Sequence, residues 1–110
     1  MQYRNLGRTG LKVSEIAMGC EGFAENDCKN TQLFFDIAEK NGINYFDLYT
    51  SNPEVRASVG QALKGRREKF IIQSHLCSIW KNGQYKRSRN IEEVKNGFEE
   101  MLSLLQTDYI

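Results

Sequence analysis

Hydrophobic and polar residues alternate along this 110-residue chain with two different periods, one typical of strands and one typical of helices. Apolar runs of strand length predict strands at residues 2–6, 11–16, 16–19, 43–46, 70–72 and 107–110. Helices are predicted to begin at Asp27 or Asn30, at Pro53 and at Asn90. The order is a hairpin followed by β-α-β-α-β-α-β, which predicts an α/β fold with a parallel sheet and right-handed crossovers.

Each predicted helix carries apolar residues three or four positions apart, so each should bury one face. These faces comprise Leu33, Phe34, Ile37 and Ala38 in the first helix, Val55, Val59, Ala62 and Leu63 in the second, and Ile91, Val94, Phe98, Met101, Leu102 and Leu105 in the third. Gly42 and Gly65 follow the first two helices, where glycine commonly ends a helix. Residues 21–26 and the longer polar stretch 78–89 are predicted to be loops.

The stretch 43–56 organises the rest of the chain. Asp47 falls where its predicted strand runs out. Ser51 followed by Glu54 is the spacing of a capping box, and Pro53 suits the first turn of a helix. A strand, an acidic residue at its end and a capped helix make one βα unit, and chemistry gathers at the carboxyl ends of such strands. Asp47 is therefore the first candidate for a functional residue.

Composition and local motifs argue against several classes of function. The formal charge of +1 gives no electrostatic argument for nucleic-acid binding. No window approaches the ~20 apolar residues that cross a membrane, and the first ten residues lack the apolar core of a signal peptide, so we expect a cytoplasmic protein. No G-x-G-x-x-G follows the first strand, which argues against a Rossmann dinucleotide site. The turn at residues 7–10 belongs to the predicted hairpin and is no phosphate loop.

The three cysteines, Cys20, Cys28 and Cys77, are unevenly spaced and form no C-x-x-C pair. An odd number in a cytoplasmic chain argues against a disulfide framework. Zinc and iron–sulphur sites usually need four ligands with a close pair, so we predict no metal site within these residues.

Four segments together resemble the aldo-keto reductase family: YRNLGRTGLKVSEIAMGC, NGINYFD, VGQALKGRREKFII and LLQTDYI. The resemblance implies a (β/α)8 barrel whose amino-terminal hairpin plugs the barrel floor. It also implies hydride transfer between NADP or NAD and a small-molecule carbonyl or other redox substrate. A full barrel takes roughly 250 residues. Residues 1–110 would then be the truncated amino-terminal portion of a single barrel domain, covering the hairpin, three βα units and the start of the fourth strand.

The family's catalytic set is an aspartate, a tyrosine, a lysine and a histidine. Asp47 matches the aspartate, and by this resemblance it is also the candidate cofactor-binding residue. Asn52 stands where the tyrosine is usual, and His75 stands where the lysine is usual. The position of the histidine would follow Ile110. An asparagine cannot give up a proton near neutral pH, so the ordinary mechanism does not transfer to this chain.

His75 is the candidate substitute proton donor, because a histidine titrates near pH ~6.5 and Asp47 could hold it protonated. The alternative is a histidine that is hydrogen-bonded in the barrel mouth without moving a proton. Tyr49 is a second candidate donor or else a packing residue. Glu54 fits the capping box, and Arg56 is either a surface charge or an anion ligand.

The variant segments FDLYTSNPEVR, IIQSHLCSIW and NGQYKRSRN resemble a branch of the family in anaerobic bacteria and archaea. There the barrel is followed by a segment carrying iron–sulphur clusters, which implies electron transfer in a longer protein. Two alternatives are a barrel that binds a nicotinamide cofactor without turnover, as a sensor or regulatory subunit, and an inert fragment. A chain that is naturally this short should be inactive alone and should self-associate, because open strand edges and apolar faces would be exposed.

Overall fold

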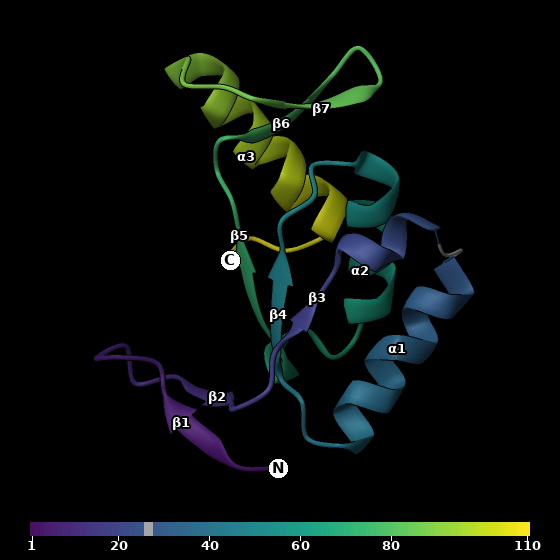
Figure 1. Cartoon of the computed structure of the whole chain (residues 1–110), viewed down its shortest axis with the longest axis vertical. Coiled ribbons are helices and arrows are strands. Elements are labelled where there is room, and N and C mark those ends of the chain that lie inside the picture. The colour runs from purple at the N-terminus through teal and green to yellow at the C-terminus, as the bar shows by residue number, and fades with distance from the viewer. Residues whose placement is uncertain (26–27) are drawn as a thin grey trace.

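A computed structural model describes residues 1–25 and 28–110 of the chain (Figure 1). Its strands are β1 (Tyr3–Asn5), β2 (Lys12–Ser14), β3 (Met18–Gly19), β4 (Tyr45–Leu48), β5 (Ile71–Ser74), β6 (Ser78–Lys81) and β7 (Gln84–Arg87). Its helices are η1 (Glu21–Glu25), α1 (Cys28–Lys40), α2 (Pro53–Leu63), η2 (Arg67–Lys69) and α3 (Ile91–Leu105). Asp27, one of the two predicted helix starts, and Asn26, the end of a predicted loop, lie outside the described residues.

The predicted α/β arrangement is confirmed. Strands β3, β4 and β5 form a parallel sheet in that order, and α1 and α2 are the connections between them. The two helices pack against each other on one face of the sheet, and α3 packs against α2 (Figure 1). Phe46 and Leu48 of β4 point toward the helices and are fully buried, whereas Tyr45 and Asp47 on the opposite face are partly exposed.

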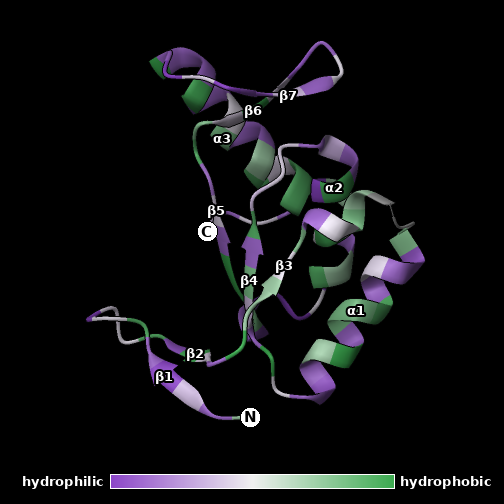
Figure 2. Ribbon diagram, viewed as in Figure 1, coloured by the Kyte–Doolittle hydropathy of each residue, from purple (hydrophilic) through white to green (hydrophobic). Residues whose placement is uncertain are grey.

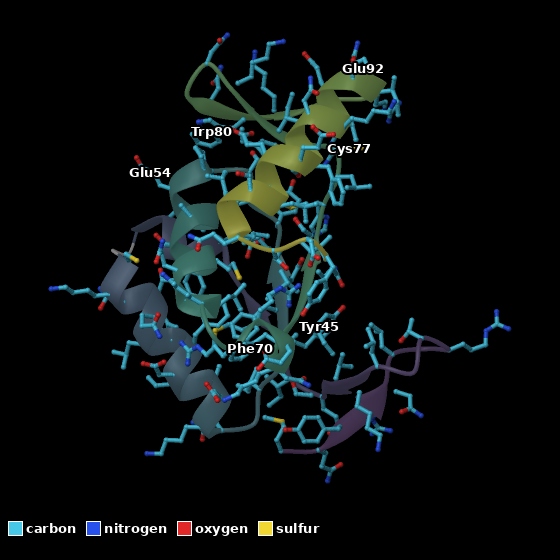
Figure 3. The ribbon with its side chains drawn as sticks, turned by 180° about the vertical axis from the view of Figure 1, so that it is seen from behind. Tyr45, Glu54, Phe70, Cys77, Trp80 and Glu92 are labelled. Carbon is cyan, nitrogen blue, oxygen red and sulfur yellow. The ribbon has the colours of Figure 1, made fainter. Side chains whose placement is uncertain are left out.

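The predicted amino-terminal hairpin is also confirmed, with β1 and β2 antiparallel. The Tyr3 hydroxyl donates a hydrogen bond to the Gly42 carbonyl at 2.8 Å, and the Ser14 amide donates to Asn44 Oδ1 at 2.8 Å. Both acceptors precede β4, so the hairpin is attached at the amino-terminal end of the parallel strands. The carboxyl ends of these strands therefore lie at the opposite end of the sheet. In Figure 3, Tyr45 and Phe70 mark the first end, and Cys77 and Trp80 lie toward the second.

The buried face of α1 differs from the prediction. Ala38 is buried as expected, but Leu33, Phe34 and Ile37 are 54%, 38% and 48% exposed, while Thr31 and Phe35 are buried. Phe35 determines this orientation. Its ring stacks on Phe46 of the sheet at a centroid distance of 4.3 Å and meets Phe70 edge-on at 5.2 Å. The apolar pattern alone did not distinguish this aromatic anchor from its neighbours.

The buried stripe of α2 is confirmed, since Val55, Val59, Ala62 and Leu63 are at most 3% exposed. Gly60 lies at a close approach of α2 to α3, because a Cβ atom there would be 2.3 Å from the Leu104 carbonyl oxygen. The apolar face predicted for α3 is only partly correct. Met101 and Leu105 are buried, Val94, Phe98 and Leu102 are half-buried, and Ile91 at the start of the helix is 64% exposed.

The predicted strand at 107–110 does not form. The Arg67 guanidinium donates hydrogen bonds to Thr107 Oγ1 at 3.1 Å and to the Tyr109 carbonyl at 3.0 Å. It also lies 4.0 Å from the centroid of the Tyr109 ring. These contacts hold the segment against η2 instead of in the sheet. The predicted loop at 21–26 also contains structure, because residues 21–25 form the 3-10 helix η1 and bury Phe23.

The predicted loop at 78–89 is instead an antiparallel hairpin, β6–β7. Asn82 and Gly83 form its turn with φ angles of 54° and 75°. Positive φ at both central residues is the requirement of the tight hairpin turn that Asn-Gly favours, and the sequence carries this signal. Figure 2 shows that the tip of this hairpin is mainly hydrophilic. No helix among the described residues has the length and apolar character needed to cross a membrane.

Candidate active site

Asp47 and His75 meet at the carboxyl ends of two adjacent parallel strands. Asp47 is the third residue of β4 and pairs with Gln73 of β5, and His75 follows β5 directly. Because side chains alternate across a sheet, Asp47, Gln73 and His75 share one face. His75 Nε2 lies 2.9 Å from Asp47 Oδ1, and the two side chains are 38% and 40% exposed. The pair is therefore hydrogen-bonded and open to a small molecule.

Gln73 continues this polar row along the sheet. Its side-chain amide donates to Asp47 Oδ1 at 3.4 Å, and its oxygen accepts a hydrogen bond from the Tyr45 hydroxyl. The carboxylate of Asp47 is thus oriented from two sides, by Gln73 and by His75. This arrangement leaves the second imidazole nitrogen of His75 as the one directed away from Asp47.

Two tyrosines extend the site from the other side of His75. The ring of Tyr49 meets the His75 ring edge-on at a centroid distance of 4.9 Å. The hydroxyls of Tyr49 and Tyr85 lie 2.8 Å apart and share a hydrogen bond. That bond lowers the pKa of Tyr85, and the Arg87 guanidinium lowers it further. Tyr49 was a sequence candidate, whereas Tyr85 and Arg87 were missed because their hairpin was predicted to be a loop.

A pocket of about 480 Å³ opens beside these groups. Its wall includes Tyr49, His75, Ser78, Tyr85, Arg87 and Arg89. The volume lies in the range of pockets that hold small molecules. His75 belongs both to this pocket and to the pair with Asp47, so a molecule in the pocket would lie against the imidazole.

The chain is similar to known proteins in both sequence and structure. It is 31% identical over 117 residues to the uncharacterized oxidoreductase YqkF of Bacillus subtilis, covering all of this chain and 37% of that protein. The solved structure of an aldo-keto reductase from Bacillus halodurans in its holo form superposes with a TM-score of 0.87 at 30% identity, covering all of this chain and 38% of that one. Sequence and structure together support the aldo-keto reductase family.

The chain is also similar to a protein with a different kind of name. A rice protein named "Probable voltage-gated potassium channel subunit beta" is 30% identical over 123 residues, which cover the whole chain and 35% of the rice protein. No protein-family model matches the chain. The chain spans a little more than a third of the length of the curated relatives it matches. Its α/β fold matches the corresponding part of the aldo-keto reductase barrels.

Asn52 occupies the position where the aldo-keto reductase resemblance places a tyrosine, and the structure gives it a structural task. It is the N-cap of α2, and its Oδ1 accepts a hydrogen bond from the Glu54 amide at 2.9 Å. The predicted capping box is therefore wrong, since Ser51 does not cap the helix. The Ser51 hydroxyl donates to the Ile79 carbonyl of β6 at 2.8 Å instead. No hydrogen bond joins Asn52 to Asp47 or His75 among residues 1–25 and 28–110.

Arg56 is neither the surface charge nor the anion ligand that the sequence left open. It is 1% exposed, and its guanidinium donates to the Thr50 carbonyl at 3.1 Å and to the Ser78 carbonyl at 3.5 Å. Burial lowers its pKa from the ordinary arginine value. With Ser51, Arg56 fixes the β6–β7 hairpin to the start of α2, so it supports the pocket without facing it.

Two cysteines border this site: the Cys20 amide donates a hydrogen bond to the Asp47 carbonyl at 3.0 Å, and Cys77 lines the pocket. Cys20 is fully buried, and burial raises the pKa of its thiol to about 12, whereas Cys28 and Cys77 are exposed. In the part of the chain that the structure describes, no three His, Cys, Asp or Glu side chains form a group that could hold a metal ion.

Proposed function

We propose that residues 1–110 form the amino-terminal portion of a single aldo-keto reductase barrel domain within a longer oxidoreductase. In this proposal β3, β4 and β5 are the first three strands of a partial (β/α)8 barrel, and residues 107–110 lead toward a fourth. The match over the whole chain to little more than a third of each relative supports this interpretation. The protein would move hydride between NADP or NAD and a small-molecule carbonyl or related redox substrate.

The observation that carries the proposal is the contact between Asp47 and His75, 2.9 Å apart at the carboxyl ends of adjacent parallel strands. When bound, the reduced nicotinamide supplies the hydride and is oxidised. His75 delivers the proton that the developing alkoxide needs, from the ring nitrogen that faces away from Asp47. Asp47 stabilises the charged imidazolium and fixes the orientation of its ring, as a carboxylate does beside other catalytic histidines.

The described residues fit one part of a nicotinamide dinucleotide. Asp47 and His75 offer the polar groups suited to the reacting end, and the adjacent pocket has the size of a small-molecule site. No glycine-rich loop before a helix N-terminus occurs in the sequence to hold the phosphates. We therefore propose that Asp47 contacts the nicotinamide end and that residues outside 1–110 bind the remainder.

Iron–sulphur coupling remains a hypothesis about the longer protein. Cys20 is buried with a protonated thiol, and the exposed Cys28 and Cys77 belong to no metal-binding group among the described residues. These side chains do not fit a cluster. Its ligands would have to lie in a carboxyl-terminal part, where bound iron in the full-length protein would reveal them.

The alternative function is a barrel that binds a nicotinamide cofactor without turnover, as a regulatory subunit. The capping role of Asn52 favours it, because the usual tyrosine donor is replaced by a residue whose oxygen is already engaged by α2. The resemblance to the rice channel-subunit protein is compatible with it. For an isolated 110-residue chain we predict inactivity and self-association, supported by the exposed apolar side chains of Leu33, Ile37 and Ile91.

Nicotinamide oxidation by the full-length protein, measured with a panel of small aldehydes and ketones, separates the two functions. We expect turnover in the wild type and a fall of about 10²–10⁴-fold in His75→Gln, the usual contribution of a general acid. Cofactor affinity should change little, because glutamine retains a side-chain hydrogen-bond donor for Asp47. Tight cofactor binding with no turnover on any carbonyl in the panel would favour the regulatory function instead.

A further inference from the structure

The wall of the pocket beside His75 contains basic side chains and no acidic ones. Arg87 and Arg89 both line it, and no aspartate or glutamate does. Asp47 lies behind His75, to which it is hydrogen-bonded, and is not part of the wall. The polar groups that line the pocket are two guanidinium groups, one imidazole, the Cys77 thiol and the hydroxyls of Tyr49, Tyr85 and Ser78.

Four other arginines have hydrogen-bond acceptors or ion-pair partners within the fold. Arg4 pairs with Glu15, and Arg66 pairs with Asp36 and Glu39. The buried Arg56 and the partly buried Arg67 donate to backbone carbonyls. Arg87 and Arg89, like Arg56 and Arg67, form no ion pair with a carboxylate of the described residues, but Arg87 and Arg89 line a pocket. Their charges are thus available to a ligand.

The hydroxyl groups of the pocket are arranged to support negative charge. Tyr49 and Tyr85 are hydrogen-bonded to each other at 2.8 Å, which aligns both phenols with the pocket wall. The lowered pKa of Tyr85 and the raised pKa of Arg87 both follow from their mutual contact and from Tyr49. The Arg87 guanidinium beside these hydroxyls supplies the positive charge that favours a bound anion.

The hairpin that carries both arginines is fixed in place. Ser51 donates to the Ile79 carbonyl of β6, and the Ser88 amide donates to the Cys77 carbonyl at 3.0 Å. Lys81 forms an ion pair with Glu93 at 2.6 Å, which ties β6 to α3. Since these contacts join the hairpin to α2 and α3, Arg87 and Arg89 are presented from a supported element beside the ends of β4 and β5.

We propose that this pocket binds the carboxylate of an anionic carbonyl substrate through Arg87 and Arg89, with the reacting carbonyl directed toward His75. The guanidinium fork matches a planar carboxylate with two parallel hydrogen bonds. The rings of Tyr49 and Tyr85, tilted by 34° with centroids 5.8 Å apart, provide an apolar wall for the body of such a molecule. The assignment of the carbonyl end rests on the proposed function, whereas the carboxylate site does not.

The test measures binding without turnover. Benzoate, its neutral analogue methyl benzoate and inorganic phosphate are titrated separately into the full-length protein by calorimetry. We expect benzoate to bind more tightly than methyl benzoate by at least about tenfold, the difference that a charge-assisted hydrogen bond makes. Equal binding of the two would overturn the proposal. Tighter binding of phosphate than of benzoate would assign the arginines to a cofactor phosphate and would also overturn it.

Variants locate the site. Arg87→Met and Arg89→Met should each weaken benzoate binding by about tenfold, and the double variant should abolish it. Lys86→Met is the matched control, because Lys86 lies on the same strand, carries the same charge and does not line the pocket. Benzoate affinity that falls equally in Lys86→Met would show a general charge effect and contradict the proposal.

Reduction of 4-carboxybenzaldehyde and benzaldehyde then separates this proposal from the proposed function. A preference for the carboxylated aldehyde that is lost in Arg87→Met supports both. Benzoate binding without any aldehyde reduction leaves the carboxylate site standing and contradicts only the catalytic role. Reduction of both aldehydes at equal efficiency contradicts the carboxylate site and leaves the catalytic role standing.

Discussion

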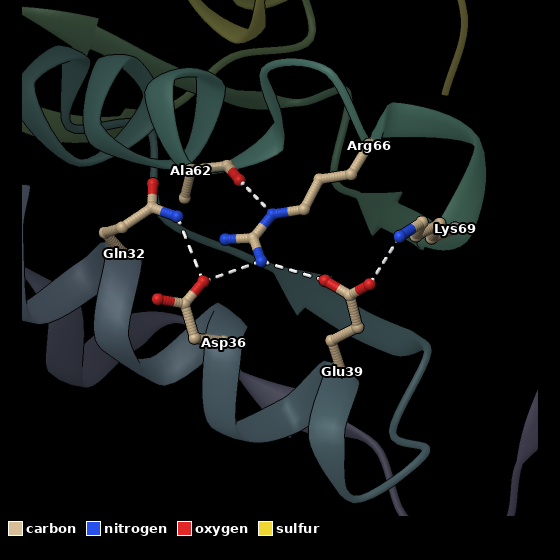
Figure 4. Close-up of polar contacts among 6 residues, drawn as sticks. All are labelled: Gln32, Asp36, Glu39, Ala62, Arg66 and Lys69. Carbon is tan, nitrogen blue, oxygen red and sulfur yellow. Dashed lines mark hydrogen bonds and ion pairs between the residues drawn. The ribbon is translucent and has the colours of Figure 1, made fainter.

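Two polar clusters of the molecule are built from similar residues but differ in how their charges are compensated. The helix cluster, comprising Gln32, Asp36, Glu39, Arg66 and Lys69, joins α1 to the segment after α2 (Figure 4). The strand-end site, comprising Asp47, Tyr49, His75, Tyr85 and Arg87, lies where β4 and β5 end. Both contain an acid beside a cationic or potentially cationic group at short distance.

The helix cluster is internally compensated. Arg66 Nη1 contacts Asp36 at 2.7 Å and Glu39 at 2.9 Å, while its Nε donates to the Ala62 carbonyl at 2.7 Å (Figure 4). Lys69 contacts the other oxygen of Glu39 at 2.5 Å. The Arg66 side chain is only 13% exposed. Two acids balance two bases, so this cluster stabilises the packing of α1 and has no charge left for a ligand.

The strand-end site differs in its compensation and its access. Asp47 and His75 are each about two-fifths exposed, a pocket of about 480 Å³ lies beside them, and Arg87 has no carboxylate partner in the described parts of the chain. The difference shows that an ion pair by itself does not identify a site. Uncompensated charge beside a pocket at strand ends makes the second cluster the candidate site, because there a ligand can complete the contacts.

The largest expected difference between the two clusters is in turnover, when one aspartate of each cluster is replaced by asparagine. Asp47→Asn should lower turnover of the full-length protein by about 100-fold, since the imidazolium of His75 loses its carboxylate partner. Asp36→Asn should leave turnover unchanged. Steady-state rates with a fixed aldehyde, together with melting curves of both variants, check this pair. Equal loss of activity in both variants would mean that the two clusters do not differ as described.

A smaller effect is expected for stability when Arg66 is replaced. Arg66→Met should lower the free energy of unfolding by about 1–2 kcal/mol, because charge-assisted hydrogen bonds to two acids and one carbonyl are lost. The loss is limited because Nη2 of Arg66 is buried without a partner among the described residues, so the methionine also removes an unfavourable group. Arg87→Met should leave the free energy of unfolding nearly unchanged. Urea unfolding of the two variants provides the comparison.

The pH dependence of this stability has a definite sign. Hydrogen bonds from Lys69 and then Arg66 lower the pKa of Glu39 in the folded chain. The Glu39 contribution is therefore fully present above the ordinary glutamate pKa of ~4.3 and is lost as the pH falls through the lower folded value. The stability difference between wild type and Arg66→Met should shrink on acidification below pH ~4.3. A difference that grows on acidification would contradict the pairing.

The smallest effect on stability is expected at Asn52, the N-cap of α2. Asn52→Ala should cost about 1 kcal/mol through loss of the α2 cap, whereas Asn52→Asp should cost little, because aspartate caps equally well. Asn52→Asp also removes the amide donor of Asn52. If the residue only caps the helix, this variant keeps both its melting temperature and its turnover. A variant that melts normally but turns over slowly would return Asn52 to the catalytic set.

Much of the fold follows from the sequence where local signals agree. The βαβ order, the glycine end of α1 and the stripe on α2 were predicted because hydrophobic periodicity and turn residues point the same way. Asp47 and His75 could be brought together in advance, since parallel strands end at the same edge. Tyr85 and Arg87 were missed, although the Asn82-Gly83 turn signal in the sequence favours the hairpin that carries them.

The remaining errors arise from contacts made far apart in the sequence. Periodicity placed Leu33 and Ile37 in the core, but stacking of Phe35 on Phe46 rotated α1 away from that face. The capping box at Ser51 was plausible locally, yet its hydroxyl is used by β6, 28 residues further along. Residues 107–110 have strand composition but are held by Arg67. In each case a contact with a residue distant in the sequence determined the structure.

The central claim, that Asp47 and His75 act as one proton-transferring pair, is tested most directly by a double-variant cycle in the full-length protein. Turnover is measured for Asp47→Asn, His75→Gln and the double variant, with cofactor binding as the control for folding. Residues that act as a unit are strongly non-additive. The double variant should therefore be no slower than His75→Gln alone. Losses that multiply in the double variant would show that the two residues act independently and would contradict the claim.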